Sequence, residues 1–294
     1  MYHTTNNTTT TVGLATATVI EKTVGECSTL TTLELVYPRY IHSEFMTHRM
    51  FSRNASSSRA TPVAKMIQEV CDHPVIPTEI YKNCKGMQGK EEITNGWDYD
   101  NFVAGWESAI DNAVSVAKSL EELGVHKQHI NRILEPFQFI RVIVTATEWE
   151  NFFELRDSEM AQPEIRDLAR AMKGAMGKDF EKLHEWWGYH LPYITQDDID
   201  NIREHACSIT DCVDGILEVS SARCARVSYL KHDGGLCDLD KDIELGIQLQ
   251  IARHMSPMEH QAIPAKNPLK FYANFKGFKS YRYALEHDKF KGFY

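Results

Sequence analysis

The chain has 294 residues, of which 43% are hydrophobic and 25% are charged, and this composition excludes a disordered, collagen-like or coiled-coil protein. Its formal net charge of −9 argues against general binding to duplex DNA or to anionic membranes, because both need a broad basic surface. We therefore expect no nucleic-acid and no membrane partner, whereas a small anionic ligand is compatible with a local arginine cluster.

The sequence also indicates a cellular compartment. No apolar run approaches the roughly 18–20 residues of a membrane span, and the polar, threonine-rich N-terminus does not resemble a signal peptide. Seven cysteines without a CxxC pair favour a reducing compartment over a disulfide framework. We expect a soluble protein of the cytoplasm, or of the host cytoplasm if the source is a virus.

Hydrophobic periodicity predicts a mixture of strands and helices. Residues 1–12 are expected to form a flexible tail before a single domain over residues 13–294. Strands are expected at 13–24, 30–37 and 138–147. Helices are expected at 40–50, 61–70, 99–123, 148–155, 163–187, 209–219 and 241–254, with a serine-rich loop at 51–59 and a long connection at 72–98. This order predicts an α+β fold, with a mixed or antiparallel central sheet flanked by long helices.

The most unusual segment runs from Thr47 to Arg59 and interleaves serine hydroxyls with arginines. Such a mixture suits a phosphate group, because guanidinium forks bind its oxygens in pairs and serines add short donors. Taken alone, however, this composition fits a solvated polar loop at least as well.

Two further segments carry polar residues in unusual combinations. Asn151–Arg156 ends on an arginine beside a turn, where a side chain can be held rigidly at a pocket, although an ordinary helix end with salt bridges is the simpler explanation. Arg253–His260 contains two histidines and a glutamate, but Ser256 and Pro257 break the helix between them. This spacing is not the zinc-binding face of an HExxH helix, and we predict no metal site.

Taken together, these segments resemble the flavin-dependent thymidylate synthase family, ThyX. The family signature of Arg-His-Arg, seven residues, serine and x-Arg is similar to Thr47–Arg49 followed by Ser57 and Arg59. Further family motifs are matched by Asn151–Arg156 with Ala161–Ile165, by Ala225–Tyr229, and by His254–His260.

The order of these motifs differs from that of the family. The last two normally precede the strand that leads to Arg-His-Arg, whereas here they follow it. The chain therefore resembles a circularly permuted member, in which residues 13–190 hold the family core and residues 191–294 resemble the family's N-terminal part. Permutation is tolerated when the natural and the new ends lie at the surface. We predict that residues 225–260 pack beside residues 30–59, with His260 close to Leu30.

The resemblance implies a homotetramer in which several subunits together form each site, at their interfaces. The partners that it implies are small molecules, a nucleotide and a folate. Members bind FAD, take reducing equivalents from NADPH, and transfer a one-carbon unit from methylenetetrahydrofolate to C5 of dUMP, which gives dTMP. They use no enzymic thiol, so activation of the pyrimidine is electrostatic.

The resemblance also implies roles for individual residues. Those that would bind the nucleotide are Ser57, Arg59, Arg132, Arg156 and Glu44. Arg156 and Ser57 are the expected catalytic residues, with Arg156 stabilising negative charge on the pyrimidine ring. Those that would contact the flavin are His48, Arg49, Asn151, His254, Ser256 and Glu259.

Departures from the family pattern fall on ligand-facing positions and keep three functions open. Thr47 stands where the family has an arginine, and Ala55 stands where it has a glutamate or glutamine. Glu44 replaces a glutamine, and Met160 replaces a histidine. Beside thymidylate synthesis, a carboxylate at Glu44 would accept a hydrogen bond from a cytosine amino group. The alternatives are therefore a dCMP methyltransferase or dUMP hydroxymethylase, and a non-catalytic flavin- or nucleotide-binding homologue.

Overall fold

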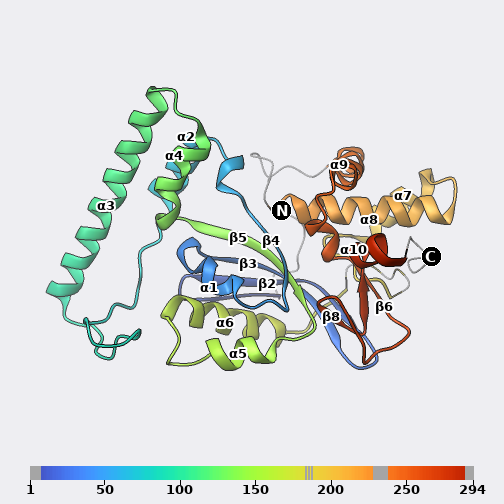
Figure 1. The fold of residues 1–294 in the computed structure, drawn as a ribbon, viewed down its shortest axis with the longest axis horizontal. Coiled ribbons are helices and arrows are strands. Elements are labelled where there is room, and N and C mark those ends of the chain that lie inside the picture. Colours follow the sequence, from blue (N-terminus) through green and yellow to red (C-terminus); the bar gives the residue numbers. More distant parts are fainter. Residues whose placement is uncertain (1–7, 183, 185, 187, 228–237, 289–294) are drawn as a thin grey trace.

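The computed structural model describes residues 8–182, 184, 186, 188–227 and 238–288. A five-stranded sheet in the order β1-β2-β3-β5-β4 forms its centre, and every neighbouring pair is antiparallel (Figure 1). The strands are β1 (Thr9–Val12), β2 (Ala15–Val24), β3 (Thr29–Pro38), β4 (Ser52–Ala55) and β5 (Phe139–Ala146). Together with the helices that surround this sheet, the topology confirms the predicted α+β fold.

The central pair, β3 and β5, is in register from Thr31 opposite Ala146 to Pro38 opposite Phe139. Successive side chains of a strand point to opposite faces of the sheet, so Leu33, Leu35 and Tyr37 share one face and are fully buried. The opposite face carries polar side chains from both strands.

Two helices cover the apolar face, α5 (Glu150–Arg156) and α6 (Pro163–Met176), and α6 packs mainly on β1 and β2. Their apolar side chains join those of the strands in one core; members include Leu35, Val142, Phe152, Leu168 and Met172. The helix predicted over residues 163–187 ends at Met176, before Gly177, because glycine weakens helical structure.

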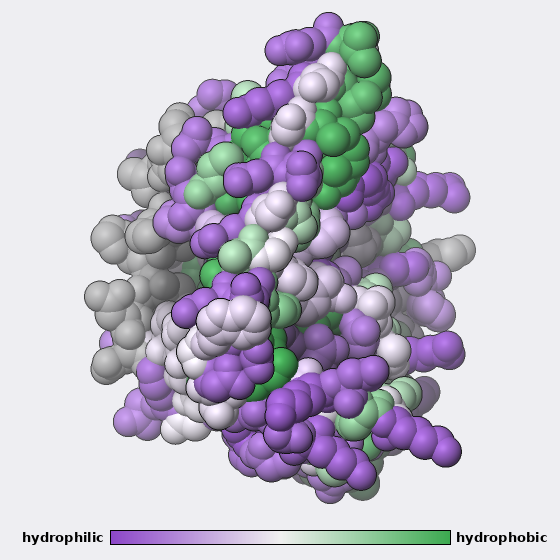
Figure 2. Space-filling view, turned by 90° about the vertical axis from the view of Figure 1, so that its left-hand side faces the viewer, coloured by the Kyte–Doolittle hydropathy of each residue, from purple (hydrophilic) through white to green (hydrophobic). Residues whose placement is uncertain are grey.

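Three other helices form a lobe at one end of the sheet, α2 (Val63–Asp72), α3 (Gly96–Glu122) and α4 (Lys127–Leu134) (Figure 1). This lobe has its own apolar core, which includes Val70, Ala117 and Ile130. Figure 2 views the molecule from the α3 side and shows apolar surface gathered at the upper end of this face. Large apolar side chains exposed near the end of α3 include Val116 and Leu123, and Leu123 is 77% exposed.

The remaining helices lie at the other end of the sheet: α7 (Gln196–His205), α8 (Ile209–Ala225) and α9 (Leu239–Ile251). A buried ion cluster joins them, because Arg223 of α8 binds Asp198 of α7 and Asp242 of α9 at 2.6 and 3.0 Å. After α9, the described residues form four short strands and three short helical turns: η5 (Ser256–Glu259), β6 (Ala262–Pro264), β7 (Phe271–Tyr272), β8 (Phe275–Lys276), β9 (Phe278–Ser280), α10 (Tyr281–Tyr283) and η6 (Ala284–Asp288).

The contacts expected of a permuted family member are present. Asn54 of β4 donates from Nδ2 to the Cys224 carbonyl at 3.1 Å, and Ser256 donates to Asn54 Oδ1 at 3.1 Å. His260 Nδ1 lies 2.8 Å from the Thr145 hydroxyl, on the strand that pairs with β3 next to Leu30. The predicted packing beside residues 30–59 is therefore confirmed at η5, which lies against β4, whereas helix α9 packs on α8. Ser228 and Tyr229 lie outside the described residues.

Several predicted boundaries are wrong. Residues 9–12 were expected in the flexible tail but form β1, where the hydroxyls of Thr9 and Thr18 are 2.9 Å apart. The helix expected at 40–50 is shorter, since α1 spans His42–Met46 after a 3₁₀ turn over Arg39–Ile41. The predicted loop at 51–59 begins with edge strand β4, which has no apolar alternation to indicate it. Helices α4 and α7 were not predicted.

Within the described ranges, no helix is both long and apolar enough to cross a membrane.

Leu35→Ala tests whether the core beneath β3 holds the sheet together. Removing this fully buried side chain leaves a cavity, and we expect the free energy of unfolding to fall by about 2–5 kcal/mol in urea denaturation. Val24→Ala, at a position on β2 that is 75% exposed, is the control and should change it by about 0.5 kcal/mol or less. Equal effects of the two substitutions would contradict this description of the core.

Candidate functional site

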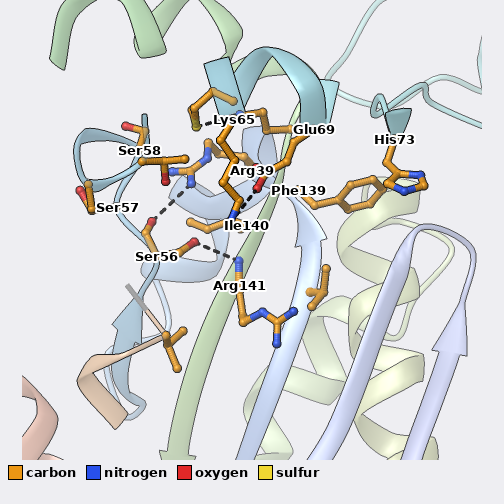
Figure 3. A pocket seen from close by; sticks show the side chains of 16 residues that line it. Arg39, Ser56, Ser57, Ser58, Lys65, Glu69, His73, Phe139, Ile140 and Arg141 are labelled. Carbon is orange, nitrogen blue, oxygen red and sulfur yellow. Dashed lines mark hydrogen bonds and ion pairs between the residues drawn. The ribbon is translucent and has the colours of Figure 1, made fainter. Parts of the chain in front are cut away.

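A cavity of about 610 Å³ opens between the end of β3, the loop after β4, and helix α2 (Figure 3). Three basic residues that are distant in sequence line it, namely Arg39, Lys65 and Arg141. The serines of the Thr47–Arg59 segment also line it, namely Ser56, Ser57 and Ser58. The cavity thus combines cations with hydroxyl groups, as expected for an anion site.

The serine loop is fixed by its backbone on both sides of Ser57. Ser56 donates its N–H to the Arg141 carbonyl at 2.9 Å, and Asn131 of α4 donates from Nδ2 to the Ser58 carbonyl at 2.7 Å. Among the described residues, none forms a hydrogen bond with the Ser57 side chain. Its hydroxyl is therefore held at the cavity and available to a ligand.

The cations of the cavity are unevenly compensated. Arg141 donates to Glu34 at 2.7 Å, and this carboxylate also accepts the Tyr193 hydroxyl at 2.7 Å. Arg39 Nη1 is 3.7 Å from Glu135, whereas Arg132 donates to both oxygens of that carboxylate at 2.9 and 3.1 Å. Burial lowers the pKa of Arg39, an effect that the neighbouring Arg132 increases and Glu135 opposes. The Glu135 carboxylate is therefore shared by two arginines.

A second group of side chains joins two of the predicted motifs. Arg156, the last residue of α5, donates from Nε to His48 Nε2 at 3.1 Å. The His48 ring packs edge-on against Phe152, with the ring centroids 4.8 Å apart. Burial, together with Arg156 and Arg53, lowers the pKa of His48 to about 4, so the ring is neutral at pH 7 and can accept this bond. The two motifs, 108 residues apart, thus meet at one hydrogen bond.

A third group lies along β4, between these two. Arg53 donates from Nη1 to the carbonyls of Phe45 and His48 at 3.1 and 3.0 Å, which holds the turn after α1. Burial lowers the pKa of Arg53, whereas Tyr37 and Glu259 of η5 oppose this effect. Glu259 in turn accepts from Arg282 of α10 at 2.6 Å. The Ser256–Asn54 bond completes this group, so His48, Ser256 and Glu259 are brought to the same strand.

Within the described ranges, no hydrogen bond or ion pair joins the other predicted site residues to these groups. Four of them have exposed side chains for which no described contact joins them to the three groups above: Arg49, Arg59, Asn151 and His254. Arg132 is 58% exposed and is bound to Glu135 rather than directed into the cavity. Glu44 is half-buried and accepts from the neighbouring Ser43 at 2.9 Å.

The sequence did not indicate the three cations of the cavity or Arg282. One signal was available for Arg141, which interrupts the apolar run of β5 and so marks a position on the polar face of the sheet. Arg39 and Lys65 carry no local signal, because the cavity that they line is made only when β3, α2 and the serine loop come together.

Comparison with known families agrees with this geometry. The model of the Thy1 family, described as thymidylate synthase complementing protein, matches residues 20–180, which is more than half of the chain. The chain therefore belongs to this family, the flavin-dependent thymidylate synthases, and is a methyltransferase of that type. The matched span contains the motifs at 47–59 and 151–165, whereas the motifs between 225 and 260 lie beyond it.

Two further comparisons complete this picture. No curated protein matches the sequence. Among solved structures, the chain is similar to the UMP/dUMP methylase PolB from Streptomyces cacaoi bound with 5-Br UMP. The sequence identity is 17%, the TM-score is 0.40, and the match covers 50% of this chain and 67% of that chain.

Titration of the His48 ring tests the hydrogen bond at the centre of the site. The ring should remain neutral down to a pH of about 4, because protonation would break the bond and place two cations together. Arg156→Gln should raise the pKa of His48, while burial keeps it below the ordinary value of 6.5. Imidazole nitrogen NMR measures both values. A His48 pKa that Arg156→Gln leaves unchanged would contradict the contact.

Proposed function

We propose that the protein transfers a one-carbon unit from methylenetetrahydrofolate to C5 of dUMP, giving dTMP, with reducing equivalents that pass from NADPH through FAD. The hydrogen bond between His48 and Arg156 carries this proposal, because it joins the expected flavin-binding and pyrimidine-binding motifs in one site. Membership of the Thy1 family supports the same chemistry.

The nucleotide would be held by the residues that the family motifs indicate: Ser57, Arg59, Arg132, Arg156 and Glu44. The Arg156 guanidinium is fixed through Nε by His48, and its Nη groups have no hydrogen-bond partner among the described residues. A cation held in this way can stabilise negative charge that develops on a pyrimidine ring, without reorganising during the reaction. His48 would therefore orient Arg156 in addition to contacting the flavin.

The residues along β4 have the chemical groups that binding of FAD requires. Arg53 uses only Nη1 on the described residues, so Nε and Nη2 can reach an anionic group such as a diphosphate. The residues that the family motifs indicate for contact with the flavin are His48, Arg49, Asn151, His254, Ser256 and Glu259. FAD, when bound, supplies the redox chemistry, and the chain supplies binding and orientation. NADPH and methylenetetrahydrofolate would act as co-substrates.

We also propose a homotetramer with sites at subunit interfaces. Arg59, Asn151 and His254 are exposed, and among the described residues no hydrogen bond or ion pair joins them to the other site residues, as expected if a second subunit completes each site. The exposed apolar side chains near the end of α3 supply surface that a subunit contact would bury.

We propose a cytoplasmic location, because all six cysteines in the described ranges are free.

The nature of the product tests the proposed reaction. Purified protein with FAD, NADPH, methylenetetrahydrofolate and dUMP should form dTMP, detected by mass spectrometry. A parallel reaction with dCMP tests the cytosine alternative that Glu44 motivates. A hydroxymethylated nucleotide, or a product from dCMP alone, would replace the proposed reaction with the corresponding alternative, and no product from either nucleotide would contradict it.

Arg156→Ala tests the residue expected to activate the pyrimidine. Removing a preorganised group that stabilises developing charge should lower kcat for dTMP formation by roughly 10²–10³-fold. Arg156→Lys should recover part of this loss, because it keeps the charge without the planar fork. Arg203→Gln, which removes the same charge from the exposed face of α7, is the control and should leave kcat unchanged. An unaltered kcat in Arg156→Ala would contradict the assignment.

A further inference from the structure

Hydroxyl groups from three strands form a row across the polar face of the central sheet. Thr145 of β5 lies between Thr32 of β3 and Ser52 of β4, each directly opposite it in the register. The Thr32 and Thr145 hydroxyls are 2.6 Å apart, and all three side chains are buried. This face of the sheet therefore offers hydroxyl groups, rather than apolar side chains, to the segments that pack on it.

Two buried histidines from the later part of the sequence bind the threonines of this row. His260 Nδ1 is 2.8 Å from the Thr145 hydroxyl, and His190 Nε2 is 2.7 Å from the Thr32 hydroxyl. Neither histidine has exposed surface. The backbone of His190 also pairs with that of Ala262, through N–H to carbonyl bonds of 2.8 and 3.1 Å. Residue 190 and residues 260–262 are thus joined to each other and to the sheet.

The hydrogen bonds continue beyond His190 to a buried carboxylate. His190 Nδ1 lies 3.0 Å from the Thr23 hydroxyl. That hydroxyl donates to Glu21 and accepts from Lys182, each at 3.4 Å. Glu21 is fully buried, and Lys182 and His184 lie 3.6 and 3.3 Å from its two oxygens. One continuous series of hydrogen bonds, the buried network, therefore runs through Glu21, Thr23, His190, Thr32, Thr145 and His260.

The carboxylate of Glu21 sets the direction of the buried network, because it can only accept hydrogen bonds. Thr23 has a single hydroxyl hydrogen, which it gives to Glu21, so its oxygen accepts from Lys182 and from His190. Burial lowers the pKa of His190 well below its ordinary value of 6.5, so the ring is neutral at pH 7 and carries one hydrogen. That hydrogen is therefore on Nδ1, and Nε2 is an acceptor.

The same direction continues to the other end of the buried network. His190 Nε2 accepts from Thr32, and Thr32 accepts from Thr145. Thr145 then accepts from Nδ1 of His260, whose ring is also neutral because burial lowers its pKa to about 3. His260 Nε2, which is buried and has no hydrogen-bond partner among the described residues, is thus an unprotonated nitrogen. The opposite direction would bury an N–H group there without an acceptor, which is costly.

The buried network ends at the candidate site. His260 directly follows η5, which lies against β4. Within η5, Ser256 donates to Asn54 of β4 at 3.1 Å, and Glu259 accepts from Arg282 at 2.6 Å. Two residues that are expected to contact the flavin thus lie on a turn whose end is hydrogen-bonded to the centre of the sheet.

We propose that Glu21 and His190 are positioning residues, which hold η5 against β4 through the buried network. Side chains that contact a ligand keep their geometry when hydrogen bonds from the residues behind them fix their position. The consequence for the flavin rests on the proposed function, since that function assigns Ser256 and Glu259 to FAD. None of the motifs in the sequence includes Glu21 or His190.

Two substitutions of Thr145 separate its hydroxyl from its shape. Thr145→Val keeps the shape but cuts the buried network, whereas Thr145→Ser keeps the hydroxyl. Thr145→Val should weaken FAD binding by about 3–10-fold in a fluorescence titration, which corresponds to one hydrogen bond, and Thr145→Ser should stay close to the wild type. Without FAD, Thr145→Val should also speed amide hydrogen exchange over residues 256–262.

Further variants serve as the control and as the reserve. Thr18→Val removes a hydroxyl pair, that of Thr9 and Thr18 at 2.9 Å, from between β1 and β2 of the same sheet. It should change neither FAD affinity nor hydrogen exchange over residues 256–262. Thr32→Val cuts the buried network one bond earlier, so it should reproduce the effects of Thr145→Val and remains informative if that variant does not fold.

Imidazole nitrogen NMR tests the direction of the buried network, which packing alone does not set. In the wild type, His260 should carry its hydrogen on Nδ1. Glu21→Gln keeps the shape of the side chain but can also donate, so His260 should shift toward the form protonated at Nε2, although four residues of the network separate the two. In the Thr145→Val background, Glu21→Gln should have no effect on His260, because the connection is already cut.

The outcomes separate this inference from the proposed function. Wild-type protein that binds no FAD would contradict the proposed function, and hydrogen exchange and NMR would still decide the inference. FAD affinity and hydrogen exchange that Thr145→Val leaves unchanged would contradict the inference alone. Equal losses in Thr145→Ser and Thr145→Val would assign the effect to shape and overturn it, as would a wild-type His260 protonated at Nε2.

Discussion

The antiparallel pairing of β3 with β5 fixes the position of the cavity and of the C-terminal part of the chain relative to the sheet. Its register places Val36 opposite Arg141 and brings Arg39, which follows β3, next to Gln138, and these residues line one wall of the cavity. The same pairing brings Thr32 opposite Thr145, whose hydroxyl meets His260 from the C-terminal part of the chain. A shift of one residue would turn each of these side chains to the other face of the sheet. The buried face of β3, with Leu33, Leu35 and Tyr37, therefore secures the site as well as the fold.

Circular permutation is compatible with this arrangement because contacts, not chain order, build the site. Asn54 on β4 binds both the end of α8 and Ser256 on η5, so residues that follow position 222 in sequence lie against the Thr47–Arg59 segment in space. The ion cluster around Arg223 ties α7, α8 and α9 into a unit that can be placed on the sheet whichever end of the chain it belongs to.

The sequence was sufficient for the fold class, for the main strands β2, β3 and β5, and for the choice of His48 and Arg156 as candidate site residues, but not for the hydrogen bond that joins them. Those predictions depended on alternating apolar residues and on motif spacing, both of which are local. β1 and β4 were missed because their threonines, serine and asparagine show no apolar alternation, and only pairing with a neighbouring strand makes them strands. Arg39 was missed for a related reason: the Glu135 carboxylate that it shares with Arg132 and the cavity that it lines arise from segments that meet only in the folded chain. Local patterns identify the residues of a motif, whereas charge compensation is a property of the tertiary structure.

The most direct measurement is the visible absorption spectrum of the purified protein after addition of FAD, with dUMP and then dCMP titrated in. A bound flavin whose absorption band shifts on addition of dUMP is the expected result, because the His48–Arg156 hydrogen bond places side by side a residue proposed to contact the flavin and a residue proposed to contact the pyrimidine. A protein that stays colourless after FAD is added, or a flavin band that neither nucleotide alters, would contradict a shared flavin and nucleotide site.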